Sequence, residues 1–176
     1  ISLGRTLFLN KKICILVPII LVHSSISLND CFAKDNKTSL SLPRFASLRS
    51  DEVNIRTGPG LRYPIEWVYQ RRSMPVEIIA EYETWRKVRD SEMVLGWIHQ
   101  SMLSGKRHIL VINSRQLLRK RNATKSAAVA EVEPGVIGTL KYCELNNEWC
   151  EIEIKKYKGW LLRTQFWGVQ PNEAID

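Results

Sequence analysis

The sequence predicts an all-β protein made of two tandem small β-barrels that follow an N-terminal signal peptide. Three observations support this prediction. Short runs rich in Val, Ile, Trp and Tyr alternate with turn signals at intervals of about ten residues. Apolar residues at helical spacing occur in no long segment outside the N-terminal region. A hairpin that carries two tryptophans, at residues 85–98, occurs again at residues 149–162.

This repeat is the strongest single signal in the sequence. Trp85 and Gly96-Trp97 in the first hairpin match Trp149 and Gly159-Trp160 in the second, at offsets of 149 − 85 = 64 and 160 − 97 = 63 residues. In each hairpin, apolar runs lie on both sides of a polar turn, which is the pattern of two antiparallel strands. A unit of about 60 residues suits a small barrel, so the repeat predicts two such domains.

The N-terminal region has the layout of a secretory signal. Three basic residues precede an apolar run at 13–22, and a stretch of small residues follows it and ends at Ala33. The apolar run is too short to span a bilayer, so we expect export, with no transmembrane span in the mature chain. Cleavage after Ala33 is the favoured interpretation. Lipidation at Cys31 is the alternative, and it is weakened by Asp30, which is large for the position before a lipidated cysteine.

The segments of the chain follow from the signal and the repeat. The region that leads from the cleavage site is polar and has neither a helical nor a strand period. The predicted divisions are a signal peptide at 1–33, a linker at 34–44, a first barrel at 45–107, a second barrel at 108–170 and a tail at 171–176.

Charge narrows the choice of partners. The chain has 26 basic and 18 acidic residues, and removal of the predicted signal leaves 23 and 17, a net charge of +6. A basic protein in the periplasm or outside the cell meets anionic cell-wall polymers and lipid headgroups, whereas nucleic acid is not an expected partner there. The alternative is that this moderate charge only keeps the protein soluble.

The two cysteines outside the predicted signal are Cys143 and Cys150. If Asn146-Asn147 forms the turn of a hairpin, the two cysteines face each other across its strands. In an oxidising compartment this geometry favours a disulfide, although two free thiols packed as small hydrophobes remain an alternative. A zinc site is less favoured because no histidine or third cysteine lies nearby in the sequence.

The first unit also carries a recognisable succession of motifs. In order, these are Val53-Asn54-Ile55-Arg56-Thr57-Gly58-Pro59-Gly60, Tyr63-Pro64, Trp85-Arg86-Lys87-Val88 and Gly96-Trp97-Ile98. The succession resembles the bacterial SH3-like domain, and the second unit is similar over the same span, with Leu117-Leu118-Arg119 in the place of residues 54–56. The resemblance implies a small, strongly bent barrel that is exported, commonly repeated in tandem, and used for attachment to the cell envelope or to peptides. Many members of the family carry a catalytic domain beside these modules.

The two units differ in the loop after the shared arginine. In the first unit, Thr57-Gly58-Pro59-Gly60 predicts an irregular loop, because proline lacks a donor and glycine favours backbone angles closed to other residues. The second unit has Lys120-Arg121-Asn122-Ala123 there and has lost both glycines and the proline. Binding that needs a tight glycine loop is therefore expected in the first unit and is in doubt in the second.

Binding residues are expected around that first loop. Aromatic rings beside arginines make a surface that can stack on sugars or peptide bonds and attract anions. The predicted ligand-binding residues are Arg56, Tyr63, Trp67, Tyr82 and Trp85. The competing interpretation makes Trp85 and Trp97 core residues that face each other across the hairpin, and it is the more favoured one for Trp97.

The resulting functional hypothesis is a non-enzymatic, exported binding module for cell-wall peptide, peptidoglycan or an envelope protein. No cofactor and no metal site is expected. An accessory subunit for a separate envelope enzyme is the alternative. A wall hydrolase is less favoured, because His99 and His108 are the only histidines outside the predicted signal, and His99 is interpreted as a surface residue at a strand end.

Overall fold

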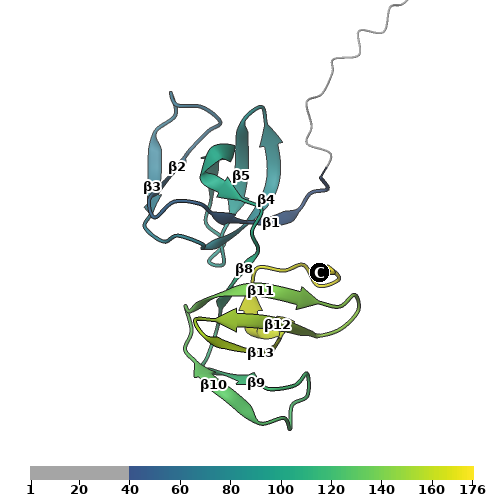
Figure 1. The fold of residues 1–176 in the computed structure, drawn as a ribbon. Coiled ribbons are helices and arrows are strands. Elements are labelled where there is room, and N and C mark those ends of the chain that lie inside the picture. Colours follow the sequence, from purple (N-terminus) through teal and green to yellow (C-terminus); the bar gives the residue numbers. More distant parts are fainter. Residues whose placement is uncertain (1–39) are drawn as a thin grey trace, which may run out of the picture. The chain divides into compact units, whose positions relative to one another are not determined.

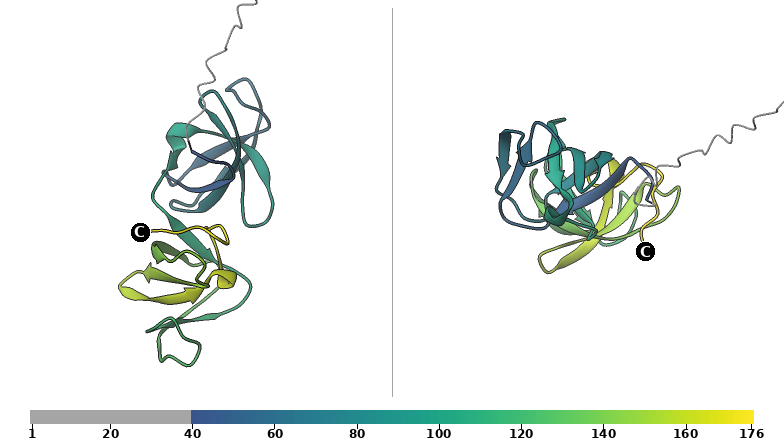
Figure 2. Two further views of the ribbon diagram at one scale, coloured as in Figure 1. Left: turned by 90° about the vertical axis from the view of Figure 1, so that its right-hand side faces the viewer. Right: turned by 90° about the horizontal axis from the view of Figure 1, so that it is seen from above.

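The computed structural model describes residues 40–176, so the predicted signal peptide, its cleavage site and Cys31 lie outside the described residues. The described chain forms two separate antiparallel sheets of seven strands each (Figure 1). This confirms the all-β prediction of two tandem barrels. The strands of each sheet are strongly curved, as further views show (Figure 2).

The first barrel contains seven strands in the order β3-β2-β6-β5-β4-β1-β7. Its elements are β1 (Arg44–Leu48), β2 (Val53–Arg56), β3 (Ile65–Tyr69), β4 (Pro75–Tyr82), β5 (Trp85–Arg89), β6 (Leu95–His99), the 3-10 turn η1 (Gln100–Met102) and β7 (Leu103–Ser104). The first strand begins one residue earlier than predicted.

The second barrel repeats this order as β10-β9-β13-β12-β11-β8-β14. Its elements are β8 (His108–Val111), β9 (Gln116–Arg119), β10 (Ala128–Val132), β11 (Ile137–Cys143), β12 (Trp149–Ile154), β13 (Tyr157–Leu162), the 3-10 turn η2 (Arg163–Gln165) and β14 (Phe166–Trp167). Each element of the first barrel thus has a counterpart of the same type and order in the second.

Irregularities in strand pairing explain the curvature. The register between β4 and β5 shifts between Ile78 and Ala80, and that between β11 and β12 shifts at the matching place, between Leu140 and Tyr142. An extra residue in one strand of a pair bends that strand and increases its twist. A bulge in the same hairpin therefore helps to curve each sheet around its own core.

Each barrel has its own hydrophobic core. Along each strand, alternate side chains point inward and fill the core, as the two-residue period of a strand requires. The first core contains Ala46, Leu48, Val53, Ile55, Val76, Ile78, Val88, Ile98 and Leu103. The second contains Ile109, Val111, Leu118, Val132, Leu140, Cys143, Cys150, Ile152, Ile154, Leu161 and Phe166.

The glycine of each Gly-Trp pair permits a close approach of two paired strands. A Cβ on Gly96 would lie 2.1 Å from Cγ2 of Ile55, and one on Gly159 would lie 2.6 Å from the backbone oxygen of Arg119. At these points β6 pairs with β2 and β13 pairs with β9. The repeated Gly-Trp motif thus marks the place where the hairpin meets the strand that carries the shared arginine.

The hairpin of the first barrel corrects one expectation. Trp85 pairs with His99, and Trp97 pairs with Lys87, so the two tryptophans do not face each other. The turn spans residues 90–94, because the Asp90 carboxylate accepts hydrogen bonds from the backbone N–H groups of residues 92 and 94, and this length moves the register by two residues from one in which the tryptophans would be opposite each other. Trp85 is buried, with 8% of its surface exposed, and Trp97 is half-buried, whereas the core interpretation favoured Trp97.

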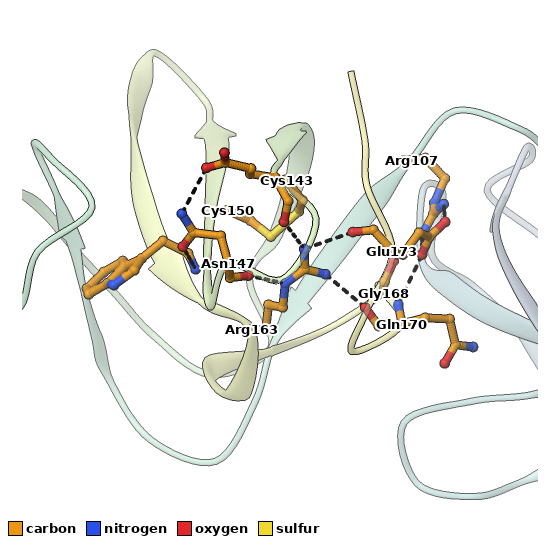
Figure 3. The surroundings of a disulfide bond; sticks show 10 residues. Arg107, Cys143, Asn147, Cys150, Arg163, Gly168, Gln170 and Glu173 are labelled. Carbon is orange, nitrogen blue, oxygen red and sulfur yellow. Dashed lines mark hydrogen bonds and ion pairs between the residues drawn. A yellow bond between two sulfur atoms is a disulfide. The ribbon is translucent and has the colours of Figure 1, made fainter.

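The predicted disulfide is present. Cys143 on β11 and Cys150 on β12 are directly paired in the ladder, with Cα atoms 4.4 Å apart, and their sulfurs are bonded (Figure 3). Both cysteines are fully buried in the second core. Ile175, in the segment predicted as a tail, forms a backbone bridge with Cys143.

Candidate functional site

A cavity of about 640 Å³ opens beside the loop of the first barrel. It lies between the end of β2, the β2–β3 loop, the start of β5 and the β6–η1 junction. The lining residues are Glu52, Asn54, Arg56, Leu61, Thr84, Trp85, His99, Ser101 and Met102. The volume falls within the usual range of ligand pockets, roughly 300–1,000 Å³.

The cavity combines an apolar wall with acidic, basic, amide and hydroxyl groups. Trp85, Leu61 and Met102 supply apolar surface, and Leu61 is 79% exposed although it is a large hydrophobic residue. A carboxylate, an amide and a guanidinium are contributed by Glu52, Asn54 and Arg56, together with the hydroxyls of residues 84 and 101. Such a mixture suits a ligand that has apolar parts and both donors and acceptors.

The guanidinium of Arg56 holds the loop in place. Its Nη1 donates to the backbone carbonyls of Leu61 at 3.2 Å and Tyr63 at 2.7 Å. The sequence presents Arg56 as a ligand-binding residue, and the structure places it in the cavity lining with part of its donor capacity already used by the loop. A change at Arg56 therefore alters both the lining and the loop.

Tyr63 packs inside the loop rather than into the cavity. Its ring fills the space next to Gly58, where an added Cβ would meet ring carbons at 2.4–2.6 Å. Neither Gly58 nor Gly60 has a positive φ, so the expectation that these glycines supply unusual backbone angles is wrong. Gly58 is needed here because it leaves room for the ring, whereas a Cβ on Gly60 would lie at an ordinary contact distance of 3.4 Å from it. Arg62 covers the Tyr63 ring, with its Cζ 5.1 Å from the ring centroid, and a hydrogen bond to the Tyr63 hydroxyl raises the pKa of Arg62.

His99 is fixed in orientation at the rim of the cavity. Its Nδ1 accepts a hydrogen bond from the backbone N–H of Ser101 at 3.3 Å and lies 2.7 Å from the Ser101 hydroxyl. A nitrogen that accepts from an N–H carries no hydrogen, so the neutral ring bears its proton on Nε2. The ring also stands edge-on to Trp85, at a centroid distance of 5.4 Å. His99 thus presents Nε2–H as a donor beside an aromatic wall.

The remaining predicted residues, Trp67 and Tyr82, are exposed but do not line the cavity. They are 54% and 53% exposed, respectively, and Trp67 lies on β3 at the edge of the sheet. The neighbouring Ile65 and Val68 on β3 are 46% and 43% exposed. Of the five predicted residues, the structure thus brings Arg56 and Trp85 together in one cavity and places the other three outside its lining.

A smaller cavity of about 240 Å³ occupies the equivalent place in the second barrel. Its lining positions match those of the first cavity at offsets of 63 or 64 residues. The matched pairs are Glu52 with Arg115, Asn54 with Leu117, Arg56 with Arg119, Leu61 with Thr124, Trp85 with Trp149, His99 with Leu162 and Met102 with Gln165. The side chain of Gln165 folds back and accepts from the backbone N–H of Leu162 at 2.9 Å.

Sequence reasoning found the two residues that recur in both barrels and missed those that differ. Arg56 and Trp85 stand in repeated motifs. Leu61, His99 and Met102 come from a loop and from the strand-to-turn junction, where no period or repeat distinguishes them. Residues 99–102 and 162–165 occupy equivalent places but have no residue in common at matching positions, so the repeat gave no signal there.

A further cavity of about 550 Å³, next to the disulfide, is framed by a structural arginine. Arg163 donates to the backbone carbonyls of residues 144, 147, 170 and 173 at 2.7–3.0 Å (Figure 3). Burial lowers the pKa of Arg163. Because its guanidinium is committed to four carbonyls, this arginine stabilises the end of the barrel and offers a ligand little.

Residues 40–176 contain no group of three or more His, Cys, Asp or Glu residues that could hold a metal ion. Over the same range there is no helix with the length and hydropathy needed to cross a bilayer.

Comparisons with solved structures gave distant similarities. NlpC1 and NlpC2 from Trichomonas vaginalis and an NlpC/P60 family protein from Bacillus cereus are each 14% identical to the chain, with TM-scores of 0.33, 0.33 and 0.31. The alignments cover 74%, 73% and 72% of this chain and 47%, 49% and 56% of those proteins. The chain therefore spans about half the length of these proteins.

A comparison with curated proteins gave no match. The family model described as Bacterial SH3 domain matches twice, at residues 49–105 and 113–168. These two stretches correspond to the two barrels and together make up more than half of the chain. The chain therefore belongs to the bacterial SH3 domain family and carries two copies of that domain in tandem.

Proposed function

We propose that the protein is a non-enzymatic, exported binding protein that attaches to the peptide part of the cell wall through the cavity of the first barrel. The observation that carries this proposal is the 640 Å³ cavity with its Trp85 wall, ringed by donors and acceptors. A short peptide has amide groups that alternate donors and acceptors and small side chains that pack on an aromatic ring. Membership of the bacterial SH3 domain family supports a binding role in the envelope.

The chemistry of the site favours binding over catalysis. The two cysteines of residues 40–176 are bonded to each other, so neither supplies a thiolate. His99 and Ser101 are within hydrogen-bonding reach, but among residues 40–176 no carboxylate forms a hydrogen bond with the other ring nitrogen. A serine nucleophile needs a base that is itself oriented by a third group. The pair is therefore assigned to ligand binding.

Co-sedimentation of the purified protein with isolated peptidoglycan tests this proposal. Asn54 is exposed, forms no side-chain hydrogen bond within the described range and lines the cavity, so Asn54→Trp fills the cavity without touching the core. We expect this variant to lose most of its retention. The matched control is Leu145→Trp, at an exposed turn position of the second barrel that lines none of the cavities described above, and this variant should be retained by peptidoglycan as the unchanged protein is.

Three outcomes would count against the proposal. These are no retention of the unchanged protein, equal retention of the Asn54→Trp variant, and loss of retention in the Leu145→Trp control alone. Release of soluble wall peptides that disappears in a His99→Ala variant would show that the protein is an enzyme instead.

A second candidate function is supported by β3. This edge strand exposes Ile65, Trp67 and Val68, and such an edge with apolar side chains is a surface on which another protein can add a strand. The protein would then be an accessory subunit of a separate envelope enzyme. Co-purification with a partner that is lost in Trp67→Ala, in the absence of affinity for wall material, would favour this function.

A further inference from the structure

The loop after the shared arginine keeps its backbone in both barrels while its residues change completely. In the first barrel, hydrogen bonds join Thr57 N–H to Pro64 O, Gly60 N–H to Gly58 O and Tyr63 N–H to Gly60 O. In the second, they join Lys120 N–H to Ala127 O, Ala123 N–H to Arg121 O and Ser126 N–H to Ala123 O. The arginine contact is also kept, since Arg119 donates to Ser126 O at 2.9 Å as Arg56 does to Tyr63 O.

Folding of this loop does not require the charges that it carries in the second barrel. The small side chain of Ser126 replaces the Tyr63 ring, and its hydroxyl accepts from the backbone N–H of Arg121 at 2.9 Å. The exposed positions then carry Lys120, Arg121 and Lys125, which we call the basic loop. None of the backbone hydrogen bonds depends on their charged groups, so they are free to serve a ligand.

No carboxylate of the described residues neutralises the basic loop. The acidic groups of the second barrel that form ion pairs do so elsewhere. Arg115 takes Glu131 and Glu133, Lys141 takes Glu153, and Lys158 takes Glu151. Within residues 40–176, none of the three cations of the basic loop is within 4.0 Å of an acidic oxygen. Three unpaired cations on one short loop create a positive potential that attracts anions.

The small cavity of the second barrel adjoins the basic loop. Arg119, directly before the loop, and Thr124, within it, line this cavity together with the half-buried Trp149 and the amides of Gln116 and Gln165. Its volume of about 240 Å³ lies below the usual range for a whole ligand, so it suits one unit of a polymer. The rest of such a polymer would lie outside the cavity, where the cations are.

We propose that the second barrel binds an anionic glycan, with one sugar ring in the small cavity against Trp149 and the acid groups of neighbouring units on the basic loop. Aromatic rings stack on sugars, amides and hydroxyls bond to sugar hydroxyls, and the cations pair with phosphodiester or carboxylate groups. This site is separate from the peptide site proposed in the first barrel. A membrane surface fits less well, because the basic loop has no large apolar side chain to insert between lipids.

Titration of the purified protein with four probes tests this proposal. Polygalacturonate supplies sugars with carboxylates, phosphomannan supplies sugars with phosphodiesters, inorganic polyphosphate supplies charge without sugar, and neutral dextran supplies sugar without charge. We expect both anionic glycans to bind more tightly than polyphosphate, and dextran not to bind. Which glycan binds better identifies the acid group. Replacement of all three cations of the basic loop by Ala should weaken glycan binding about tenfold, the sum of three exposed ion pairs.

Two further variants separate charge from the cavity and from net charge. Thr124→Trp blocks the small cavity and keeps every cation, so it should weaken glycan binding several-fold and leave polyphosphate binding unchanged. A charge-matched control, with Arg72, Lys106 and Lys156 replaced by Ala, should bind the glycans as the unchanged protein does. Circular dichroism spectra confirm that each variant is folded.

The proposal is overturned by any of four results. The basic-loop variant binds the glycans normally, the charge-matched control loses as much affinity as that variant, Thr124→Trp has no effect on glycan binding, or anionic phosphatidylglycerol vesicles or duplex DNA bind more tightly than both glycans. The second result would assign the attraction to net charge. The last result would assign the basic loop to a membrane or to nucleic acid.

Discussion

The smallest feature that shapes the candidate site is the contact between Gly58 and Tyr63. The ring of Tyr63 lies where a Cβ of residue 58 would be, and in the second barrel both partners have changed, to Arg121 and Ser126. A large ring beside a glycine and a small hydroxyl beside a longer residue are two solutions for the same loop backbone. The pair therefore varies together, and neither residue can be interpreted alone.

A double-mutant cycle tests this pairing. Gly58→Ala forces the Tyr63 ring out of its place and should cost about 1–3 kcal/mol of the free energy of unfolding, as overpacking does. With Tyr63→Ser also present, the added methyl group has room, so the double variant should be more stable than the sum of the two single changes predicts, by about 1 kcal/mol. Denaturation in urea gives the four values. Additive costs would show that the two residues are not coupled.

Tyr69 gives the stability of the first barrel a defined pH dependence. Burial and a hydrogen bond from its hydroxyl to Asp90 raise the pKa of Tyr69 above its ordinary value. The unfolded chain ionises this tyrosine near pH 10, whereas the folded chain keeps it protonated. The stabilisation is therefore complete below pH 10 and is lost as the pH rises further, by up to about 1.4 kcal/mol per pH unit.

The matching measurement compares the protein with a Tyr69→Phe variant. The variant lacks the ionisable group, so its free energy of unfolding should fall less steeply between about pH 10 and pH 11.5. Below pH 9 it should be less stable by a constant amount, because the Asp90 carboxylate has lost a hydrogen bond. Parallel curves above pH 10 would contradict the assignment.

At the scale of elements, the close approach of two paired strands determines where the site can form. β6 approaches β2 so closely that only a glycine fits at position 96, and this approach places the end of β2, with Arg56, beside the β6–η1 junction, with His99. The second barrel has the same close approach at Gly159, where β13 pairs with β9. The two cavities lie in equivalent places because the same glycine-dependent strand contact occurs in both barrels.

Gly96→Ala should disrupt the close approach of β6 to β2. Its Cβ would lie 2.1 Å from Ile55 and 3.3 Å from the backbone oxygen of Arg56, which cannot move without separating the strands. We expect a loss of about 3 kcal/mol or more in the free energy of unfolding. Gly105→Ala is the matched control, since nothing lies within 4 Å of the added methyl group, and it should change stability by less than about 1 kcal/mol. Similar effects at both positions would refute the packing explanation.

At the scale of the whole molecule, two domains of one fold have diverged in what stabilises them and in what they offer a ligand. Among the described residues the second barrel alone has a disulfide, and it has the smaller cavity and the basic loop. The first barrel has the larger cavity and the exposed aromatics of residues 67 and 82. This division of properties supports two different ligands.

Reduction of the disulfide should affect the two barrels unequally. The bond closes a loop of eight residues, which corresponds to about 2.5 kcal/mol on the chain-entropy model. Hydrogen exchange measured with and without a reductant should therefore show faster exchange at Ile152 and Leu161 in the second core, and unchanged exchange at Ile98 in the first. Equal acceleration in both cores, or none in either, would contradict this expectation.

Particular residues show how far the sequence alone can be interpreted. The hairpin strands, the repeat and the pairing of Cys143 with Cys150 follow from the order of residues, because alternation and turn residues act over a few positions. The register of the first hairpin does not, since the Asp90 carboxylate holds a turn of residues 90–94 through two backbone contacts, so that Trp85 pairs with His99 and not with Trp97. Arg56 and Trp85 were predictable as site residues because they stand in the repeat.

The sequence by itself determined that the described chain is two copies of one β-domain, joined in tandem and cross-linked once, because repetition, alternation and cysteine spacing are properties of the order of residues. Tertiary structure decided which rings are buried, that Leu61, His99 and Met102 share a cavity with Arg56 and Trp85, and that Gly58 makes room for a ring. These depend on which distant segments meet when the sheet curves. That curvature is set by β-bulges and by the close approach of paired strands rather than by any local pattern.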